Sequence, residues 1–169
     1  VCSGPGIIIR SPNGDMEHVD LLPLGNQTSG CTEFVNQSSL VVAGNATLCQ
    51  GNHSFGGVYS NRGVIEAWDI AYGGTLDCNG SNFYGDEGSG ENGIKFWSNA
   101  DNNTVKNCNM HDYEFGFELD AGSSANVAFG SEVIGCMFNS SEYDGMTIID
   151  YNLYGQYINN TIINNGRYG

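Results

Sequence analysis

One short phrase recurs along this chain at a nearly constant spacing. It reads NNTVKNC at residues 102–108, GSEVIGC at 130–136 and NNTIINN at 159–165, with looser copies NATLC at 45–49 and GTLDC at 74–78. Anchored at positions 45, 74, 103, 131 and 160, successive copies lie 29, 29, 28 and 29 residues apart. A fixed period in this range is typical of repeat architectures, in which each unit buries its apolar face against the next.

The units contain short runs typical of β-strands. Four runs begin on glycine, at 63–66, 93–96, 116–119 and 145–148, and the last three alternate apolar and polar residues as half-buried strands do. Glycine (25 residues) and asparagine interrupt every window long enough for a helix, and both tolerate the left-handed conformation of tight turns. The pattern predicts an all-β parallel β-helix of about five coils of ~29 residues. Val105, Val133 and Ile162 should then stack in one inward column.

The repeat divides the chain into two parts. Residues 38–169 carry it, and we expect them to form the coils. Residues 1–37 lack it, although the run Ile7-Ile8-Ile9 between turn signals predicts one strand. We interpret 1–37 as an N-terminal cap over the first coil, because terminal repeats are atypical. The alternative is a strand exchanged with another subunit.

The amino-acid sequence of the repeat resembles that of a known family. The phrases at 75–80 (TLDCNG), 103–108 and 159–165 are similar to those of right-handed parallel β-helix repeat proteins. These form the pectate-lyase-like superfamily, here in its NosD-like branch, and the resemblance covers residues 38–169. It implies a right-handed coil and export to the cell surface. It implies no particular activity, because the scaffold serves lyases, hydrolases, epimerases, adhesins and structural proteins.

The six cysteines are expected to form disulfides between coils. Residues one period apart in stacked coils have Cα atoms about 5 Å apart, within the range that a disulfide needs. By matching position, the expected pairs are Cys49 with Cys78, Cys108 with Cys136 and, for the remaining two, Cys2 with Cys31. The alternative is a ladder of reduced, buried cysteines. The sequence contains no Cys-x-x-Cys pair, so the cysteines do not indicate a metal site.

Acceptor sites for N-glycosylation are in excess. Roughly three Asn-x-Ser/Thr triplets would arise by chance. The chain has them at Asn26, Asn36, Asn45, Asn52, Asn79, Asn102, Asn139 and Asn159. Together with the cysteines, they predict an exported glycoprotein located outside the cell or at its surface. The opening residues, VCSG, are expected to be a processed mature N-terminus.

The charge excludes some partners. With 19 acidic and 5 basic residues, the net charge is -14, which repels phosphate backbones and anionic membranes. We therefore expect no nucleic-acid partner. No run approaches the ~18 apolar residues that cross a bilayer, so we expect no membrane insertion.

No catalytic set is recognisable in the sequence. A lyase on this scaffold needs acidic residues holding Ca²⁺ and a lysine or arginine as base. Lys95 and Lys106 fall on repeat strands, and we interpret each as a solvated outward residue. The clustered Asp, His-Gly and Arg-x-Lys of a β-helix hydrolase do not occur, nor does Gly-x-Ser-x-Gly. The sequence therefore favours a non-enzymatic protein.

Calcium is the one candidate cofactor. The glycine-rich loop at 86–92 brings together Asp86, Glu87 and Glu91, and hard cations prefer such oxygens. The alternative is an ordinary acidic surface turn. Aromatic residues could likewise stack on sugars or fill the core, and we favour the core. They are Phe96, Trp97, Tyr113, Phe115, Phe117, Tyr143, Tyr151, Tyr154 and Tyr157.

A stack of coils has strand edges at its ends, and unpaired edges invite pairing with other chains. We therefore expect copies of this chain to associate end to end. The preferred hypothesis is a non-catalytic extracellular structural glycoprotein that assembles into a filament or surface layer. The alternative is a carbohydrate-binding or carbohydrate-cleaving β-helix, calcium-dependent or not, or an adhesin for cell-surface glycans.

Overall fold

A computed structural model of the chain describes eleven stretches of it: residues 7–10, 16–17, 30–31, 39–42, 44–54, 62–67, 73–86, 90–97, 100–120, 128–149 and 152–167. Within these stretches every regular element is a strand, so the predicted all-β class is confirmed. No helix that could cross a membrane is found in this part of the chain.

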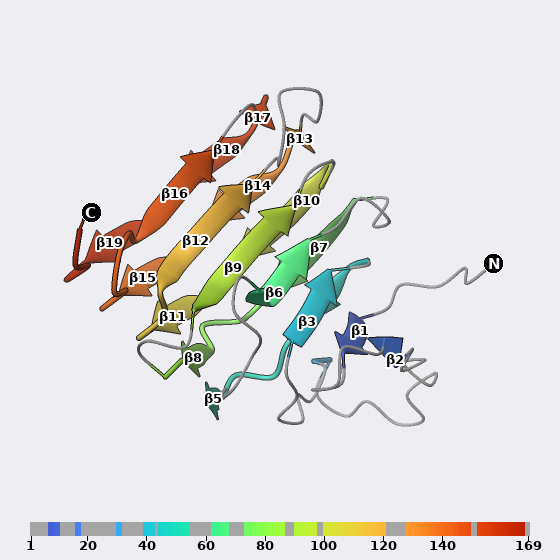
Figure 1. Cartoon of the computed structure of the whole chain (residues 1–169). Coiled ribbons are helices and arrows are strands. Elements are labelled where there is room, and N and C mark those ends of the chain that lie inside the picture. Colours follow the sequence, from blue (N-terminus) through green and yellow to red (C-terminus); the bar gives the residue numbers. More distant parts are fainter. Residues whose placement is uncertain are drawn as a thin grey trace.

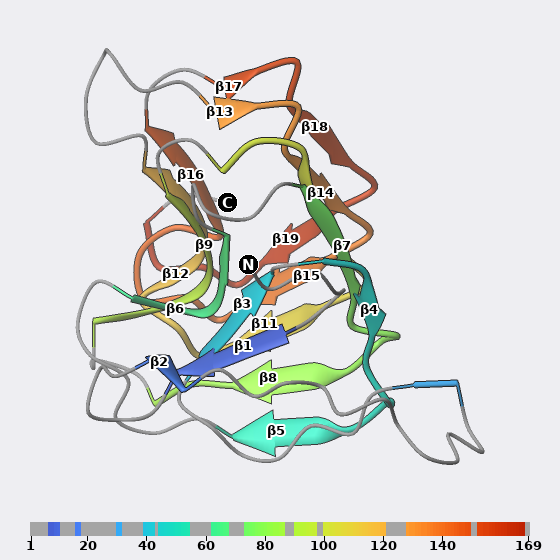
Figure 2. The ribbon, with the colours of Figure 1, turned by 90° about the vertical axis from the view of Figure 1, so that its right-hand side faces the viewer.

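Three parallel sheets form the sides of the coil (Figures 1 and 2). Face 1 consists of β3 (Ser39–Val42), β6 (Arg62–Ala67), β9 (Glu91–Trp97), β12 (Phe115–Asp120) and β16 (Met146–Ile149). Face 2 consists of β4 (Ala46–Thr47), β7 (Gly74–Asp77), β10 (Asn103–Lys106), β14 (Glu132–Ile134) and β18 (Gln156–Ile158). Face 3 consists of β5 (Asn52–Ser54), β8 (Asn82–Tyr84), β11 (Asn109–His111), β15 (Met137–Asn139) and β19 (Thr161–Ile163). The chain passes the faces in this order and then begins the next coil, which makes the fold a parallel β-helix.

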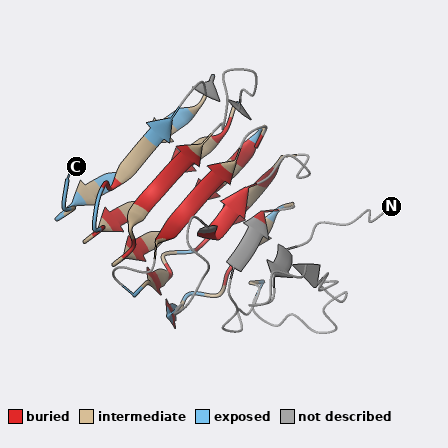
Figure 3. Cartoon of the chain, in the orientation of Figure 1, coloured by how far each residue is buried: buried red, intermediate tan, exposed pale blue. Residues whose placement is uncertain are grey.

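The coils differ in how fully they are stacked. The three middle coils have a neighbour on both sides, and they contain most of the buried residues (Figure 3). The first and last coils have a neighbouring coil on one side only. The fully stacked part is therefore about three turns rather than the five that the period predicted, although each face has five parallel strands.

Two further pairs of strands lie outside the three-sided coil. β1 (Ile7–Arg10), which is the strand predicted at Ile7-Ile8-Ile9, pairs antiparallel with β3, and β2 (Met16–Glu17) pairs with β1. β13 (Ala128–Phe129) and β17 (Asn152–Leu153) form a small parallel sheet. Most of residues 1–37 lie outside the described stretches, so their interpretation as a cap or exchanged segment stays a prediction.

The predicted inward column is confirmed for its first two members. Val105 lies opposite Leu76 on one side and opposite Val133 on the other, and all three are buried. Burial of each such side chain stabilises the fold by roughly 1.5–3 kcal/mol. The third member, Ile162, was placed wrongly: it lies opposite Phe138 on face 3, and Tyr157 lies opposite Val133 instead.

The error has a physical cause in the last coil. Asn102 and Asn159 both turn a corner with positive φ (54° and 55°), so the phrase NNT recurs. The first corner precedes face 2 and the second precedes face 3. The last coil is also short, because Glu132 pairs with Gln156, 24 residues on, whereas Thr104 pairs with Glu132, 28 residues on.

The abundance of asparagine is explained by the corners. A left-handed residue lets the chain turn from one face to the next, and asparagine adopts this conformation more readily than most side chains. The asparagines with φ between 52° and 56° are Asn79, Asn102, Asn107, Asn159 and Asn164. The expectation that asparagine marks tight turns is therefore confirmed at these positions.

Candidate functional site

The cysteines join neighbouring coils, but not in the predicted pairs. Cys31 is bonded to Cys49 and Cys78 to Cys108, with Cα atoms 4.8 and 4.9 Å apart, and Cys136 is a buried free thiol. Since Cys31 is bonded to Cys49, the predicted disulfide between Cys2 and Cys31 is wrong. Cys2 itself lies outside the described residues.

The wrong pairing of Cys49 comes from a register shift of one residue. Thr47 lies opposite Asp77, which places Leu48, not Cys49, opposite Cys78. Leu48 is fully buried in the core, and Cys49 is half-buried and bonds elsewhere. Cys108 and Cys136 do match in position, but Cys108 is already bonded to Cys78.

Lys95 is not the solvated residue that the sequence suggested. It is fully buried, and its Nζ lies 2.6 Å from Glu118 Oε2 and 3.8 Å from Asp120 Oδ2. The amine also lies 4.3 Å from the centre of the Trp97 ring. Asn92 Nδ2 donates to the same Glu118 oxygen at 2.6 Å. A buried ammonium is tolerated only with such partners, so this cluster holds adjacent coils together.

The charges of this cluster follow the strand register. Glu66 lies opposite Lys95, and Lys95 lies opposite Glu118, so opposite charges face each other on β6, β9 and β12. Glu66 is buried as well, and one of its oxygens accepts the Gly63 N–H at 3.0 Å. Ion pairing occupies the lysine, whereas a lyase base must be available to take a proton from substrate.

Lys106, the other lysine on a repeat strand, is an ordinary partly exposed residue. Its Nζ lies 3.3 Å from Asp77 Oδ2. Burial acts to raise the pKa of Asp77, but hydrogen bonds from Asn107 and Asn79 and the charge of Lys106 outweigh it, so that pKa is lowered.

The calcium candidates do not form a described site. Asp86 is exposed, Glu91 is buried in β9, and Glu87 lies outside the described residues. In the stretches that the structure covers, no three His, Cys, Asp or Glu side chains converge as metal ligands would. The acidic loop as a whole is therefore untested, because Glu87 is not included.

A ladder of amides runs along the outer side of face 3. Asn82 Nδ2 donates to Asn52 Oδ1 at 2.8 Å, and Asn109 Nδ2 donates to Asn82 Oδ1 at 3.1 Å. His111 continues the ladder, with Nε2 3.4 Å from Asn82 Oδ1 and Nδ1 3.3 Å from Asn139 Nδ2. The His111 ring also stacks on Tyr84, with centroids 4.9 Å apart. Burial lowers the pKa of His111, and the charge of Asp112 opposes this shift.

The glycosylation triplets fall into two structural groups. Asn52 and Asn139 are members of the amide ladder, and Asn45 Oδ1 accepts the Thr75 N–H at 3.0 Å. The second group lies at exposed corners outside the ladder; it consists of Asn79, Asn102 and Asn159. Asn26 and Asn36 lie outside the described residues.

The aromatic residues mostly fill the core, as expected. Phe96, Tyr113 and Phe117 are buried, and Tyr157 packs against the core from the last coil. Phe115 and Tyr143 form a pair at the surface, with centroids 5.5 Å apart, and Tyr154 is exposed. Tyr151 lies outside the described residues.

The last coil exposes apolar residues at strand edges. β16, β18 and β19 each end their sheet. Their exposed residues include Ile148, Ile149, Ile158 and Ile163. Ile148 lies opposite the buried Leu119, so it belongs to an inward column, whereas Ile149 lies opposite Asp120 on the outer side. At Ile148 an inward column is thus exposed in this chain, and we call this side of the last coil the open end of the stack.

Charge is distributed unevenly among the coils. Each middle coil has charged residues in its strands, such as Glu66, Lys95 and Glu118. The strands of the first coil (SLVV, AT and NHS) and of the last coil (MTII, QYI and TII) contain no Asp, Glu, Lys or Arg. In a chain of net charge -14, the coil strands at both ends are therefore uncharged, although β1 and β2, next to β3, contain Arg10 and Glu17.

Comparison of the chain with models of protein families, with curated proteins and with solved structures finds no significant match.

Proposed function

We propose that this chain is a non-catalytic extracellular structural β-helix that associates end to end with copies of itself into a filament or surface layer. The observation that carries the proposal is the last coil, whose three edge strands are uncharged and present half-exposed isoleucines. Native proteins usually protect such edges with charges, proline or a covering element.

Strand edges and charge both favour an end-to-end contact. β4 and β5 are the edges of faces 2 and 3 at the first coil, so β18 and β19 of another copy can add to them as parallel strands. Face 1 differs, because β1 and β2 extend its sheet beyond β3, so β16 of another copy would meet these two strands. The charged middle coils of two stacked copies would lie roughly 14 Å apart, beyond the screening length of about 8 Å in physiological salt. Repulsion between the charged strands of the middle coils is therefore largely screened in this arrangement.

The extracellular location is a further part of the proposal. Two disulfides fit an oxidising compartment, although only weakly. The excess of glycosylation triplets, three of them at exposed corners, points the same way. Membership of the pectate-lyase-like superfamily, in its NosD-like branch, is proposed from the amino-acid sequence of the repeats alone.

Two matched variants test the self-association. Ile148 and Ile149 are adjacent in β16 and equally exposed (44% and 45%), but only Ile148 lies in a column that continues the core. Ile148→Lys should abolish association in light scattering and electron microscopy of the purified chain, and Ile149→Lys should leave it largely intact. Circular dichroism should show that both variants are folded.

The outcomes separate the parts of the proposal. A wild-type chain that stays monomeric at high concentration would refute self-association. Equal loss in the two variants would show that the contact does not continue the core. Particles that stop at dimers would retain self-association but refute the filament.

The carbohydrate-binding alternative rests on a different observation, the amide ladder with the stacked Tyr84 and His111 on face 3. Amides and ring faces are groups that bind sugars. A glycan array tests it: binding that is lost in Tyr84→Ala and kept in Ile148→Lys would favour a glycan-binding protein or adhesin. Lys95, the candidate base nearest the acidic loop, is buried in ion pairs and does not favour the carbohydrate-cleaving form.

A further inference from the structure

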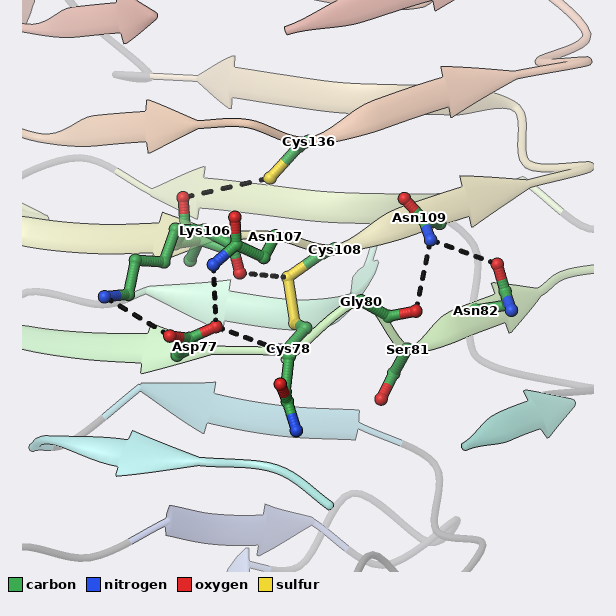
Figure 4. Close-up of a disulfide and its surroundings, with 12 residues drawn as sticks. Asp77, Cys78, Gly80, Ser81, Asn82, Lys106, Asn107, Cys108, Asn109 and Cys136 are labelled. Atoms are coloured by element: carbon green, nitrogen blue, oxygen red, sulfur yellow. Dashed lines mark hydrogen bonds and ion pairs between the residues drawn. A yellow bond between two sulfur atoms is a disulfide. The ribbon is translucent and has the colours of Figure 1, made fainter. Parts of the chain in front are cut away.

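Three cysteines lie one above another at the corner between faces 2 and 3. Cys108 follows β10, and Cys136 follows β14 on the next coil. The register on both sides of this corner, Lys106 opposite Ile134 and Asn109 opposite Met137, places the two cysteines at the same position. Cys78 lies at the same corner of the coil below and is bonded to Cys108. Cys108 is thus the middle member of a three-cysteine column (Figure 4).

Cys108 has a cysteine in each neighbouring coil, although only Cys136 shares its register position; Lys106 lies opposite Asp77, which places Cys78 opposite Asn107. The Cα atoms of Cys78 and Cys108 are 4.9 Å apart, and paired strands are spaced about 4.8 Å apart on the other side as well. Cys136 is buried, and its Sγ lies 3.9 Å from the Val105 carbonyl oxygen, one coil below. Its sulfur therefore reaches toward the coil that contains Cys108, as Figure 4 shows.

We propose that the disulfide can move along this column by thiol–disulfide exchange. The Cys136 thiolate attacks Cys108 Sγ, a Cys108–Cys136 bond forms as the Cys78–Cys108 bond breaks, and Cys78 leaves as the thiolate. The proton lost by Cys136 is taken up at Cys78. No oxidant or reductant is consumed, because one disulfide and one thiol are present before and after. Attack on a disulfide runs in line with the S–S bond, so the Cys136 sulfur must approach Cys108 from the side opposite Cys78. Burial raises the pKa of Cys136 to about 12, so little thiolate is present at neutral pH and the exchange should be faster at alkaline pH.

The exchange has only two states. Below Cys78 the column continues with Leu48, because Thr47 lies opposite Asp77. Above Cys136 it continues with Asn160, whose Oδ1 accepts the Cys136 N–H at 2.9 Å. Neither neighbour can form a disulfide. In the first state the bond joins the second and third coils, and in the second state it joins the third and fourth. The covalent link thereby moves one coil toward the open end of the stack.

Three single variants test the column, read by alkylation of free thiols after rapid unfolding in acidic denaturant and by non-reducing peptide mapping, because the three cysteines are buried in the folded chain. Cys78→Ser should contain a Cys108–Cys136 disulfide. Cys136→Ser should keep Cys78–Cys108. Cys108→Ser should leave Cys78 and Cys136 as thiols, because their Cα atoms, two coils apart at roughly 9.6 Å, exceed the disulfide range. A folded Cys78→Ser protein in which Cys108 and Cys136 are both alkylated would overturn the proposal.

The wild-type chain decides the matter if Cys78→Ser does not fold. Incubated without added thiol or oxidant and alkylated after increasing times, it should yield a growing fraction with Cys78 alkylated in place of Cys136. Cys136→Ser, treated in parallel, should yield no alkylated Cys78. Alkylation of Cys136 alone at every time point would refute the migration.

Discussion

Removal of the buried amine of Lys95 is the sharpest test of how this fold is stabilised. Lys95→Met keeps the length of the side chain and deletes its charge. It leaves Glu118, whose side chain is only 9% exposed, with Asn92 as a partner and with the negative Asp120 and Glu66 nearby. Breaking one half of a buried ion pair costs about 3–5 kcal/mol. We expect a loss of that size in the free energy of unfolding.

The measurement is urea unfolding at pH 7, with a matched control on the same scaffold. Lys106→Met removes a lysine from a partly exposed pair, where the side chains of Lys106 and Asp77 are 37% and 22% exposed. Pairs of this kind contribute about 0–1 kcal/mol, so the control should unfold near the wild-type midpoint. The double variant Lys95→Met/Glu118→Gln should recover part of the loss, because no unpaired carboxylate remains at Glu118. If Lys95→Met is no less stable than Lys106→Met, the cluster does not join the coils as we argue.

Two other predictions concern the outer surface. Burial lowers the pKa of His111 below its unfolded value of 6.5, so the unfolded chain takes up the proton first as the pH falls through 6.5, and the folded chain loses stability. His111→Gln should therefore reduce the change in melting temperature between pH 7 and pH 5. An unchanged pH dependence of the melting temperature would contradict this. In secreted material, intact glycopeptide mapping should find higher occupancy at Asn79, Asn102 and Asn159 than at Asn139, because a glycan on Asn139 would replace a hydrogen of the Nδ2 that contacts His111 Nδ1. Equal occupancy at Asn139 and at the three corners would show that the ladder does not limit glycosylation.

Much of the fold could be predicted from the sequence because its signals are local. The corner asparagines and the alternation of apolar residues depend only on the backbone and on which side of a strand a residue occupies. The stacking of Val105 with Val133 followed directly from the period. The period could not reveal that the last coil is short, since the same corner phrase precedes face 2 at Asn102 and face 3 at Asn159.

The candidate site was harder to predict because it depends on register to a single residue. A shift of one position separates Cys49 from Cys78 and places Leu48 in the column. The glycine-led runs mislead in the same way, since Gly63 lies opposite Asn92 rather than Gly93. In the observed register, Glu66, Lys95 and Glu118 alternate in sign, and this is the signal that could have identified the buried cluster. Alignment on the glycines conceals it.

Folding and assembly should be coupled through the last coil. In a solenoid each coil is stabilised by its neighbours, and the last coil has an interface with one coil while each middle coil has two. A second copy placed on β16, β18 and β19 would supply the missing interface. Binding that favours the folded state raises the melting temperature by mass action, so the transition should rise with protein concentration in the wild type and in Ile149→Lys. In Ile148→Lys it should not change with concentration. A wild-type transition that is independent of concentration would mean that the last coil is stable without a partner, and the open end would then give no reason for assembly.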